Sequence, residues 1–380
     1  TQWSSSAASD VYKRQNNSEL REFVMFPFKL YKGSKYWVPP IIEQEMNSFN
    51  KELNPNLKNA EVELYMASKN DEIVGRIAVI INWYEVKEQK TSKIRFGWFD
   101  FIDDFGVSKV LLDKVVESGN KNKLKYMEGP MGFSNLDKVG VLTSGFEIIG
   151  TMITAYNHSY YVNHYEKYGL ITEKNFHEKT FMFEDIDTAY YEKMSRIVKT
   201  RNKLNEVNFT STSEVMKRTN DMFDLFNRSY AKLSSFVKIN QEQKEFMKEK
   251  YIKFINPEYI KFVENENREI VAFAIIMPSF AKALQRMNGK LFPFGFLNLL
   301  WAKKFNKDVT LYLIGIDPNY QKLGVTAIIF NSFIQTLKDK GIQICRRTPE
   351  LTDNISIDKI WKNFNPKLIK TRSTYKLRLN

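Results

Sequence analysis

The chain has 380 residues, of which 43% are hydrophobic and 14% aromatic, so it is long and apolar enough for about two folded domains and is not disordered. One cysteine, Cys345, excludes a disulfide framework and a cysteine-based zinc site, and three histidines give no basis for a metal cluster. No run reaches the roughly 18–20 apolar residues of a membrane span, and no signal peptide is evident. The sequence therefore predicts a cytoplasmic protein without a resident metal.

The net charge of +13 is unevenly distributed along the chain. Residues 1–190 carry 23 Lys and Arg against 26 Asp and Glu, whereas residues 191–380 carry 34 against 18. A basic half favours an anionic ligand or an anionic surface as its partner.

Residues 1–15 form a Ser- and Ala-rich stretch whose end, residues 10–15, matches the translation of a transposon-type sequencing adapter. We interpret residues 1–15 as an adapter-derived tail that takes no part in the fold. The true N-terminus, including a first strand, is then expected to be missing.

Two parts of the chain resemble each other at a nearly fixed offset. Residues 69–78 and 266–274 both predict a polar turn followed by a strand, and the glutamates that match, Glu72 and Glu269, are 197 residues apart. The same offset separates Asn157 from Asn354, and residues 164–169 match residues 360–365 at an offset of 196. Three matches in order indicate a tandem duplication, with domains at residues 16–190 and 191–380.

The N-terminal half places two carboxylates, Asp103 and Asp104, in the turn that precedes its central helix. A Gly-rich loop at residues 129–135 is not followed by a helical pattern, so we interpret it as a cleft loop or a plain turn rather than a phosphate loop.

An insertion at residues 279–308 combines aromatic and aliphatic side chains with lysines and an arginine. Such a pattern is typical of an interfacial amphipathic segment or of a lid over an acyl chain. The alternative is an excursion that packs between the two domains. We keep a peripheral membrane contact through this segment as a hypothesis.

Residues 311–326 carry most of the information about function. The apolar run 311–316 predicts a buried strand, Asp317 and Pro318 predict a turn, and the apolar spacing after Gly324 predicts a helix. A strand, a tight turn and a helix N-terminus present free backbone N–H groups and a positive dipole end. The segment therefore predicts a pyrophosphate-binding loop, with an ordinary turn as the alternative.

The segment resembles motif A of the GNAT superfamily of acyl-CoA-dependent N-acyltransferases, Val-x-Pro-x-Tyr-[Gln/Arg]-x-x-Gly-x-[Gly/Ala]. Ile316, Pro318, Tyr320, Gln321 and Gly324 match this pattern. The family has Gly or Ala where this chain has Thr326. Residues 165–170, Tyr-Glu-Lys-Tyr-Gly-Leu, resemble the family's closing signature, and the whole chain is similar to a bacterial group of tandem GNAT proteins.

The resemblance implies an α+β fold of two tandem GNAT-like domains, each a mixed, mainly antiparallel sheet flanked by helices. It implies acetyl-CoA or a longer acyl-CoA as co-substrate, bound only by the C-terminal half, because two carboxylates oppose a pyrophosphate in the other. The strand residues that would hold the thioester and pantetheine, and the loop residues that would hold the pyrophosphate, are Ile314, Gly315, Ile316, Gln321, Lys322, Leu323, Gly324, Val325 and Thr326.

Three further residues follow from the family geometry. Asn354 would contact pantetheine or phosphate, or would only cap a helix. Glu350 is a candidate general base, and Tyr375 a candidate general acid for the departing thiolate; for each, a structural role is the alternative. Cys345 is assigned to core packing.

The function that these features favour is transfer of an acyl group from acyl-CoA to a primary amine of a small-molecule or lipid-like acceptor. One alternative is an aminoacyl-tRNA-dependent transferase of the tandem GNAT type, which would suit the basic half. The other is a non-catalytic protein that binds acyl-CoA or serves as a scaffold. We expect no DNA partner, and RNA is the less favoured partner.

Overall fold

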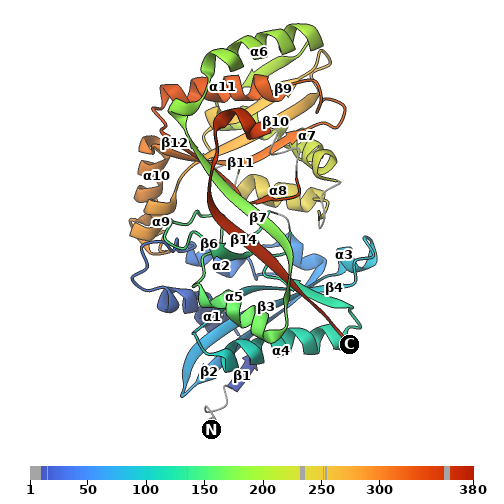
Figure 1. The fold of residues 1–380 in the computed structure, drawn as a ribbon, viewed down its shortest axis with the longest axis vertical. Helices are drawn as coiled ribbons and strands as arrows, with labels where there is room; N and C mark the ends of the chain where they lie inside the picture. The colour runs from blue at the N-terminus through green and yellow to red at the C-terminus, as the bar shows by residue number, and fades with distance from the viewer. Residues whose placement is uncertain are drawn as a thin grey trace. The chain divides into compact units, whose positions relative to one another are not determined.

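The computed structural model describes residues 10–14, 16–134, 136–231, 236–250, 252, 255–354 and 360–380 (Figure 1). The chain forms two compact units that are discontinuous in sequence. Unit 1 contains Thr1–His177, Ala281–Asn298 and Ile369–Asn380, and unit 2 contains Glu178–Phe280 and Leu299–Leu368. The proposed boundary at residue 190 lies inside a helix of unit 2, and a division of function at that point stays a prediction.

Unit 1 is built on a sheet with the strand order β1-β2-β3-β4-β5-β14-β7. Its strands β4 and β5 are parallel, while the pairs β1–β2, β2–β3, β3–β4 and β5–β14 are antiparallel. The strands are β1 (Asp10–Lys13), β2 (Ala60–Lys69), β3 (Glu72–Asn82), β4 (Lys93–Phe101), β5 (Tyr126–Gly129), β7 (Ile171–Met182) and β14 (Lys367–Arg378), with the short β6 (Val141–Ser144) beside β14. The last strand of the chain thus completes the sheet of the unit that the N-terminal half builds.

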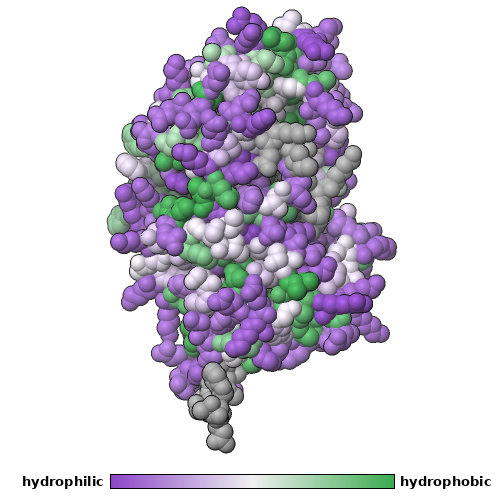
Figure 2. All heavy atoms as spheres, viewed as in Figure 1, coloured by the Kyte–Doolittle hydropathy of each residue, from purple (hydrophilic) through white to green (hydrophobic). Residues whose placement is uncertain are grey.

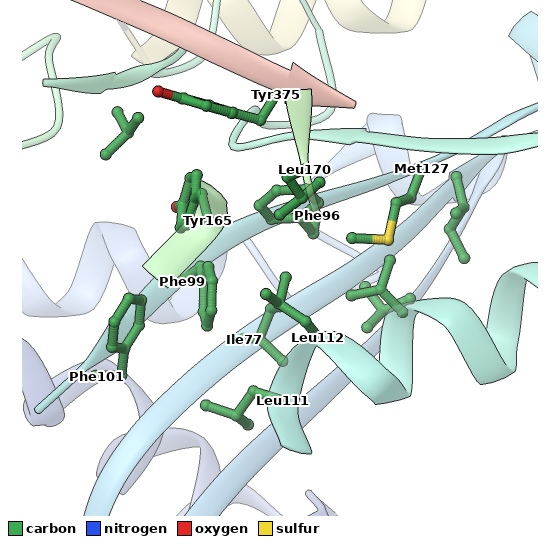
Figure 3. Packing of buried hydrophobic residues seen from close by; sticks show 14 of the residues in the cluster. Ile77, Phe96, Phe99, Phe101, Leu111, Leu112, Met127, Tyr165, Leu170 and Tyr375 are labelled. Atoms are coloured by element: carbon green, nitrogen blue, oxygen red, sulfur yellow. The ribbon is translucent and has the colours of Figure 1, made fainter. Parts of the chain in front are cut away.

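The helices of unit 1 cover this sheet. They are α1 (Asn17–Leu30), α2 (Ile42–Asn47), α3 (Trp83–Lys87), α4 (Phe105–Lys121), α5 (Tyr160–Tyr168) and α9 (Ala281–Met287). Helix α4 buries Val107, Leu111 and Val115, which share one face because they are four residues apart. Figure 3 shows the core that results, in which Leu111 and Leu112 face aromatic side chains of β4 such as Phe96 and Phe99.

Unit 2 repeats the pattern, with the strand order β7-β12-β11-β10-β9-β8. Strands β11 and β12 are parallel, and the other pairs are antiparallel. The strands are β8 (Asn205–Asn208), β9 (Ile260–Glu264), β10 (Ile270–Pro278), β11 (Asp308–Ile316) and β12 (Ile344–Arg347), with the short β13 (Glu350–Leu351). The helices are α6 (Thr188–Asn202), α7 (Thr212–Tyr230), α8 (Gln241–Lys250), α10 (Gly295–Phe305), which the division into units crosses, and α11 (Thr326–Asp339).

The two units share a sequence of features that confirms the predicted tandem α+β fold. Each has an antiparallel hairpin (β2–β3, β9–β10), and each then has a central strand with a register shift against the hairpin. In each unit a helix follows the central strand and leads to a strand that pairs with it in parallel. Both units also end a helical segment on a left-handed residue, Gly169 with φ 95° and Asn365 with φ 47°.

The expectation that residues 1–15 take no part in the fold is wrong for Asp10–Lys13. These residues form β1, in which Val11 pairs with Ala67 and Tyr12 with Met66, and both side chains pack against buried clusters of unit 1. The edge of β2 exposes unpaired backbone groups, and a Val-Tyr segment has the β propensity to pair with them. The origin of the tail stays a prediction, and residues 1–9 and 15 lie outside the described residues.

We predict that a chain beginning at Asn16 unfolds at a lower temperature than one beginning at Asp10. Loss of β1 exposes the edge of β2 and the side chains beneath Val11 and Tyr12, which should cost about 1 kcal/mol and lower the melting temperature by about 2–4 °C. Differential scanning calorimetry of both chains measures the difference. Because both chains lack residues 1–9, the comparison reports only the loss of residues 10–15. Equal melting temperatures would show that β1 contributes nothing to stability.

Candidate functional site

The central strand of unit 2 is paired on one side for only part of its length. Strand β12 pairs with β11 from Asp308↔Ile344 to Leu311↔Arg347, and Thr348 and Pro349 then leave the ladder. Proline has no N–H to donate, which stops the pairing at this point. Beyond it, residues 312–314 are half-buried, although every residue of the neighbouring β10 is buried.

The unpaired edge of β11 presents the backbone of Ile314 and Ile316. The N–H of Asp317 donates to the carbonyl of Val271 on the β10 side. Because hydrogen-bonded residues alternate along an antiparallel pair, Gly315 also faces β10, whereas Ile314 and Ile316 face the other edge. The carbonyl of Ile314 accordingly accepts a hydrogen bond from the Tyr230 hydroxyl at 3.0 Å. The carbonyl of Ile316 accepts from the Gln321 side-chain amide at 3.4 Å. The N–H groups of Ile314 and Ile316 can therefore bond to an extended ligand that carries amide groups.

Gly315 could not be replaced by a larger residue without moving its neighbours. A Cβ at this position would lie 2.2 Å from Cε1 of Phe273 and 2.9 Å from the Ser229 hydroxyl. The glycine therefore allows Phe273 of β10 and Ser229 of α7 to pack directly on the central strand.

The loop between β11 and α11 exposes a run of backbone donors. Among the described residues, no acceptor is found for the N–H groups of Gln321, Lys322, Gly324, Val325 and Thr326. Val325 caps α11 without a side-chain hydrogen bond, and Gly324 has φ +77°, a conformation that favours glycine. Gln321, Lys322 and Gly324 are exposed. Several N–H groups at the positive end of a 14-residue helix form a binding site for an anion such as a pyrophosphate.

The carboxylate that begins this loop already has partners of its own. Asp317, which begins the loop, is paired with Arg228 of α7, with 3.2 Å between Nε and Oδ2. Its other oxygen accepts from the N–H of Asn319 at 3.0 Å. Lys322 adds a positive charge in the loop itself.

The corresponding helix N-terminus of unit 1 is already occupied by a side chain. Asp104 caps α4, and its Oδ1 accepts from the N–H of Gly106 at 2.8 Å. Its other oxygen lies 3.1 Å from Nζ of Lys69. Although burial acts in the opposite direction, the Lys69 hydrogen bond and the Gly106 N–H lower the pKa of Asp104, so it stays ionised in the place of an anion.

In unit 1 the parallel pairing of β4 and β5 also stops partway along the central strand, and another segment of the chain packs there. The segment that follows β5 folds back on β4, so that the N–H of Met131 donates to the carbonyl of Phe96 at 2.8 Å. Nη1 of Arg95 holds the carbonyl of Gly132 at 2.9 Å, and Arg95 is itself fixed by Glu85. A Cβ on Gly97 would lie 2.3 Å from the Met131 carbonyl oxygen. The Gly-rich loop at residues 129–132 is thus packed along the central strand at Phe96 and Gly97.

Two side chains of unit 2 near the unpaired edge of β11, Glu350 and Tyr230, can accept or donate a proton. Glu350, a candidate base, forms a bidentate ion pair with Arg347, whose guanidinium lies over the Trp361 ring at 5.0 Å. Tyr230, which sequence reasoning missed, is the last residue of α7 and donates to Ile314. Burial and the nearby Glu350 carboxylate raise the pKa of Tyr230 to about 12, so its hydroxyl is a proton donor throughout the neutral range.

Tyr375 and Cys345, which the sequence also singled out, lie among packed side chains. Tyr375 lies in β14 of unit 1, opposite Gly129, and packs edge-on against Tyr165 with 5.1 Å between ring centroids (Figure 3). Glu350 belongs to unit 2, and the catalytic role of Tyr375 stays a prediction. Cys345 is buried in β12, and burial raises its pKa to about 12, as expected of a core thiol.

Asn354 ends the described stretch before residue 355, and its N–H donates to the carbonyl of Leu351 at 3.1 Å. The helix that it would cap lies outside the described residues, so both roles of Asn354 stay predictions.

Within the described ranges, no group of three or more His, Cys, Asp and Glu side chains is arranged to hold a metal ion. In the same part of the chain, no helix has the length and apolar character that crossing a bilayer requires.

These features define the class of the chain, which has the tandem GNAT fold. Its structure superposes on a tandem GNAT protein from the clavulanic acid biosynthesis pathway with a TM-score of 0.58 and 7% identity, over 97% of this chain and 98% of that chain. A probable N-acyltransferase from Enterococcus faecalis V583 superposes with a TM-score of 0.52 and 8% identity, over 98% and 73% of the two chains.

Two bacterial proteins are similar to the chain in sequence. Protein YghO of Escherichia coli K12 is 22% identical over 326 residues, which are 85% of this chain and 83% of that protein. The bacterial ceramide synthase of Caulobacter vibrioides is 22% identical over 324 residues, which are 84% of this chain and 83% of that protein. No family model matches the chain.

The surroundings of Tyr375 generate a prediction that separates packing from chemistry. Replacing Tyr375 with Ala should lower the free energy of unfolding by about 3–5 kcal/mol, because the ring is part of the core of unit 1. Tyr375→Phe keeps the ring and should cost about 1 kcal/mol or less. Urea unfolding followed by fluorescence measures both. A large loss with Phe would show that the hydroxyl, not the ring, is what the fold requires.

Proposed function

We propose that the chain is an N-acyltransferase that moves an acyl group from acyl-CoA to the primary amine of a lipid-like acceptor. The observation that carries this proposal is the run of N–H groups at residues 321–326 beside the unpaired edge of β11, which unit 2 has and unit 1 has closed. Similarity to a bacterial ceramide synthase over most of both chains supports a lipid-like acceptor.

In this proposal, the loop binds the pyrophosphate of CoA. The N–H groups of Gln321, Lys322, Gly324, Val325 and Thr326 would donate to its oxygens, with the dipole of α11 behind them. The exposed Leu323 lies between these donors and would flank the same ligand. Pantetheine carries two amides, and the N–H groups of Ile314 and Ile316, whose carbonyls already accept from Tyr230 and Gln321, would donate to it.

The reaction needs no covalent intermediate on the protein. The amine nitrogen attacks the thioester carbon, the C–N bond forms and the C–S bond breaks. Glu350 would accept the proton that the nitrogen loses, and Arg347 fixes the orientation of that carboxylate. The departing thiolate would take a proton from the Tyr230 hydroxyl, which solvent then restores. The products are an amide and free CoA.

We predict that the chain binds one acyl-CoA and that Gly324→Glu abolishes this binding. The variant places a carboxylate and a side chain where the backbone must approach the pyrophosphate. Isothermal titration calorimetry with acetyl-CoA should give a stoichiometry near one for the wild type and no heat for the variant.

Two controls isolate the cause of that loss. Gly324→Ala adds no charge; it introduces a side chain at positive φ and a 3.2 Å contact with Cγ2 of Val198, and should retain binding. Gly106→Glu places the same carboxylate at the N-terminus of α4 in unit 1 and should leave binding unchanged, because Asp104 already occupies that position. Two equivalent sites, or normal binding by Gly324→Glu, would contradict the assignment.

The catalytic roles generate a second prediction. With a long-chain acyl-CoA and a long-chain primary amine, mass spectrometry should detect the amide, and a thiol assay should detect equimolar CoA. Glu350→Gln should lower kcat by about 10²–10⁴-fold while acyl-CoA affinity stays the same. Tyr230→Phe should lower kcat by about tenfold or more.

The pH dependence tests the role of Tyr230 separately. Because the pKa of Tyr230 is about 12, its proton is present across the assay range. The ratio of wild-type to Tyr230→Phe activity should therefore stay constant between about pH 7 and pH 10. If the chain binds acyl-CoA but forms no amide with any amine tested, it is a binding protein and not an enzyme. If it transfers an aminoacyl group from aminoacyl-tRNA, it belongs to the other class of transferase.

A further inference from the structure

Helix α10 turns its apolar face outward. Phe296, Leu297, Leu300, Trp301 and Phe305 recur every three to five residues and so share one side of the helix. These side chains are 37–57% exposed. In the segment that leads into the helix, Phe292 and Phe294 are 68% and 72% exposed. We call these seven residues the α10 face.

The opposite side of the same helix is the buried one. Ala302 is 4% exposed, and the carbonyl of Lys303 accepts a hydrogen bond from Asn256. A helix on the surface of a water-soluble protein has the reverse arrangement, with its large apolar residues inward. Within residues 279–308, the apolar side chains of α9 are buried, whereas those of the α10 face are exposed, so packing inside the protein does not account for the α10 face. Figure 2 shows a mostly hydrophilic surface on which hydrophobic residues emerge at the left-hand edge, where Figure 1 places α10.

Positive charge surrounds this face. No Asp or Glu occurs between residues 279 and 307. The segment carries six basic residues, of which all but Lys303 are exposed: Lys282, Arg286, Lys290, Lys303, Lys304 and Lys307. Nζ of Lys304 lies 5.3 Å from the centre of the Phe305 ring, so cation and aromatic residue meet on the same face.

This charge distribution selects among the surfaces that could cover the α10 face. A second copy of the chain would add the same basic side chains to the contact, with no carboxylate of residues 279–307 to pair with them, and like charges in a contact cost free energy. A bilayer that contains anionic lipids attracts these lysines and accepts Phe, Leu and Trp side chains at the level of its headgroups.

We propose that the α10 face docks on the surface of an anionic lipid bilayer, with its aromatic and leucine side chains in the headgroup region and its lysines on the phosphates. The docking requires no acyl-CoA and no amine acceptor. It goes beyond the proposed function, although it would place a lipid-like acceptor next to the protein.

Vesicle flotation tests the proposal with the full chain. Wild-type protein should float with vesicles of phosphatidylcholine and phosphatidylglycerol at a ratio of about 7:3, and much less with phosphatidylcholine alone. Added salt should weaken the binding, because it screens exposed charges beyond about 10 Å at about 0.1 M.

Matched variants separate the two contributions. Phe294→Ser with Trp301→Ser should weaken vesicle binding by about tenfold or more, because it removes the two largest insertions from the headgroup region. Lys304→Glu with Lys307→Glu should abolish the preference for the anionic vesicles. Leu53→Ser with Ile197→Ser removes apolar side chains that are 48% and 46% exposed elsewhere on the surface and should change nothing. Circular dichroism melting of each variant controls for folding.

The outcomes decide between the alternatives. Absence of wild-type binding to anionic vesicles, or equal binding by all variants, would overturn the proposal. A wild-type dimer in light scattering that Phe294→Ser with Trp301→Ser converts to a monomer would assign the face to a second copy and would also overturn it. Because none of these measurements involves acyl transfer, failure of the proposed reaction leaves the membrane result unaffected, and the reverse also holds.

Discussion

The site in unit 2 depends on one constraint, which is that the parallel pairing of β11 and β12 stops after Leu311. Backbone N–H and C=O groups that are buried without a partner are costly, so a central strand that loses its neighbour needs another one. In unit 2 the carbonyl of Ile314 accepts a hydrogen bond from Tyr230 and that of Ile316 accepts one from the Gln321 side chain, which leaves the N–H groups of this edge for a ligand. The loop at residues 321–326 follows β11 directly, so the edge of the strand and the exposed N–H groups of the loop adjoin, as the proposed function requires.

Unit 1 shows how the same architecture behaves when this space is filled from within. Its β4 and β5 also diverge, but Met131 bonds to Phe96 and the loop carbonyl of Gly132 is held by Arg95. A nearly fully buried set of ion pairs supports this loop, formed by Arg95, Glu85, Lys93 and Glu128. Removing one of these charges would leave its partner buried without a counter-charge, so the position of the loop depends on the whole set. Asp104 supplies the anion at the helix N-terminus. With these interactions in place, the helix N-terminus and the strand edge of unit 1 have internal partners at the positions that the proposed function assigns to CoA in unit 2.

The outward-facing apolar residues of α10 form an exposed surface, whereas the loop of unit 1 has its partners within the fold. They lie on a segment that the N-terminal unit does not repeat, and they carry no acidic residues among them. An apolar surface of this kind is tolerated when a partner covers it for part of the time. A long-chain amine and a long-chain acyl group both reside in or near bilayers, so a lipid-acting transferase gains from a surface that rests there.

The sequence by itself determined the features that depend on neighbours along the chain. The hairpins, the α11 helix, the glycine at position 324 and the tandem repeat follow from apolar periodicity, turn residues and a constant offset. Tertiary structure decided the rest. Tyr230 reaches Ile314 across 84 positions, β14 completes the sheet of the unit built by the other half of the chain, and β1 pairs with β2 although its sequence carries no sign of an evolved role. Strand pairing between distant segments depends on which backbone groups still lack partners, and ion pairs between distant residues depend on which charged side chains the fold brings together. A local sequence pattern contains neither kind of information.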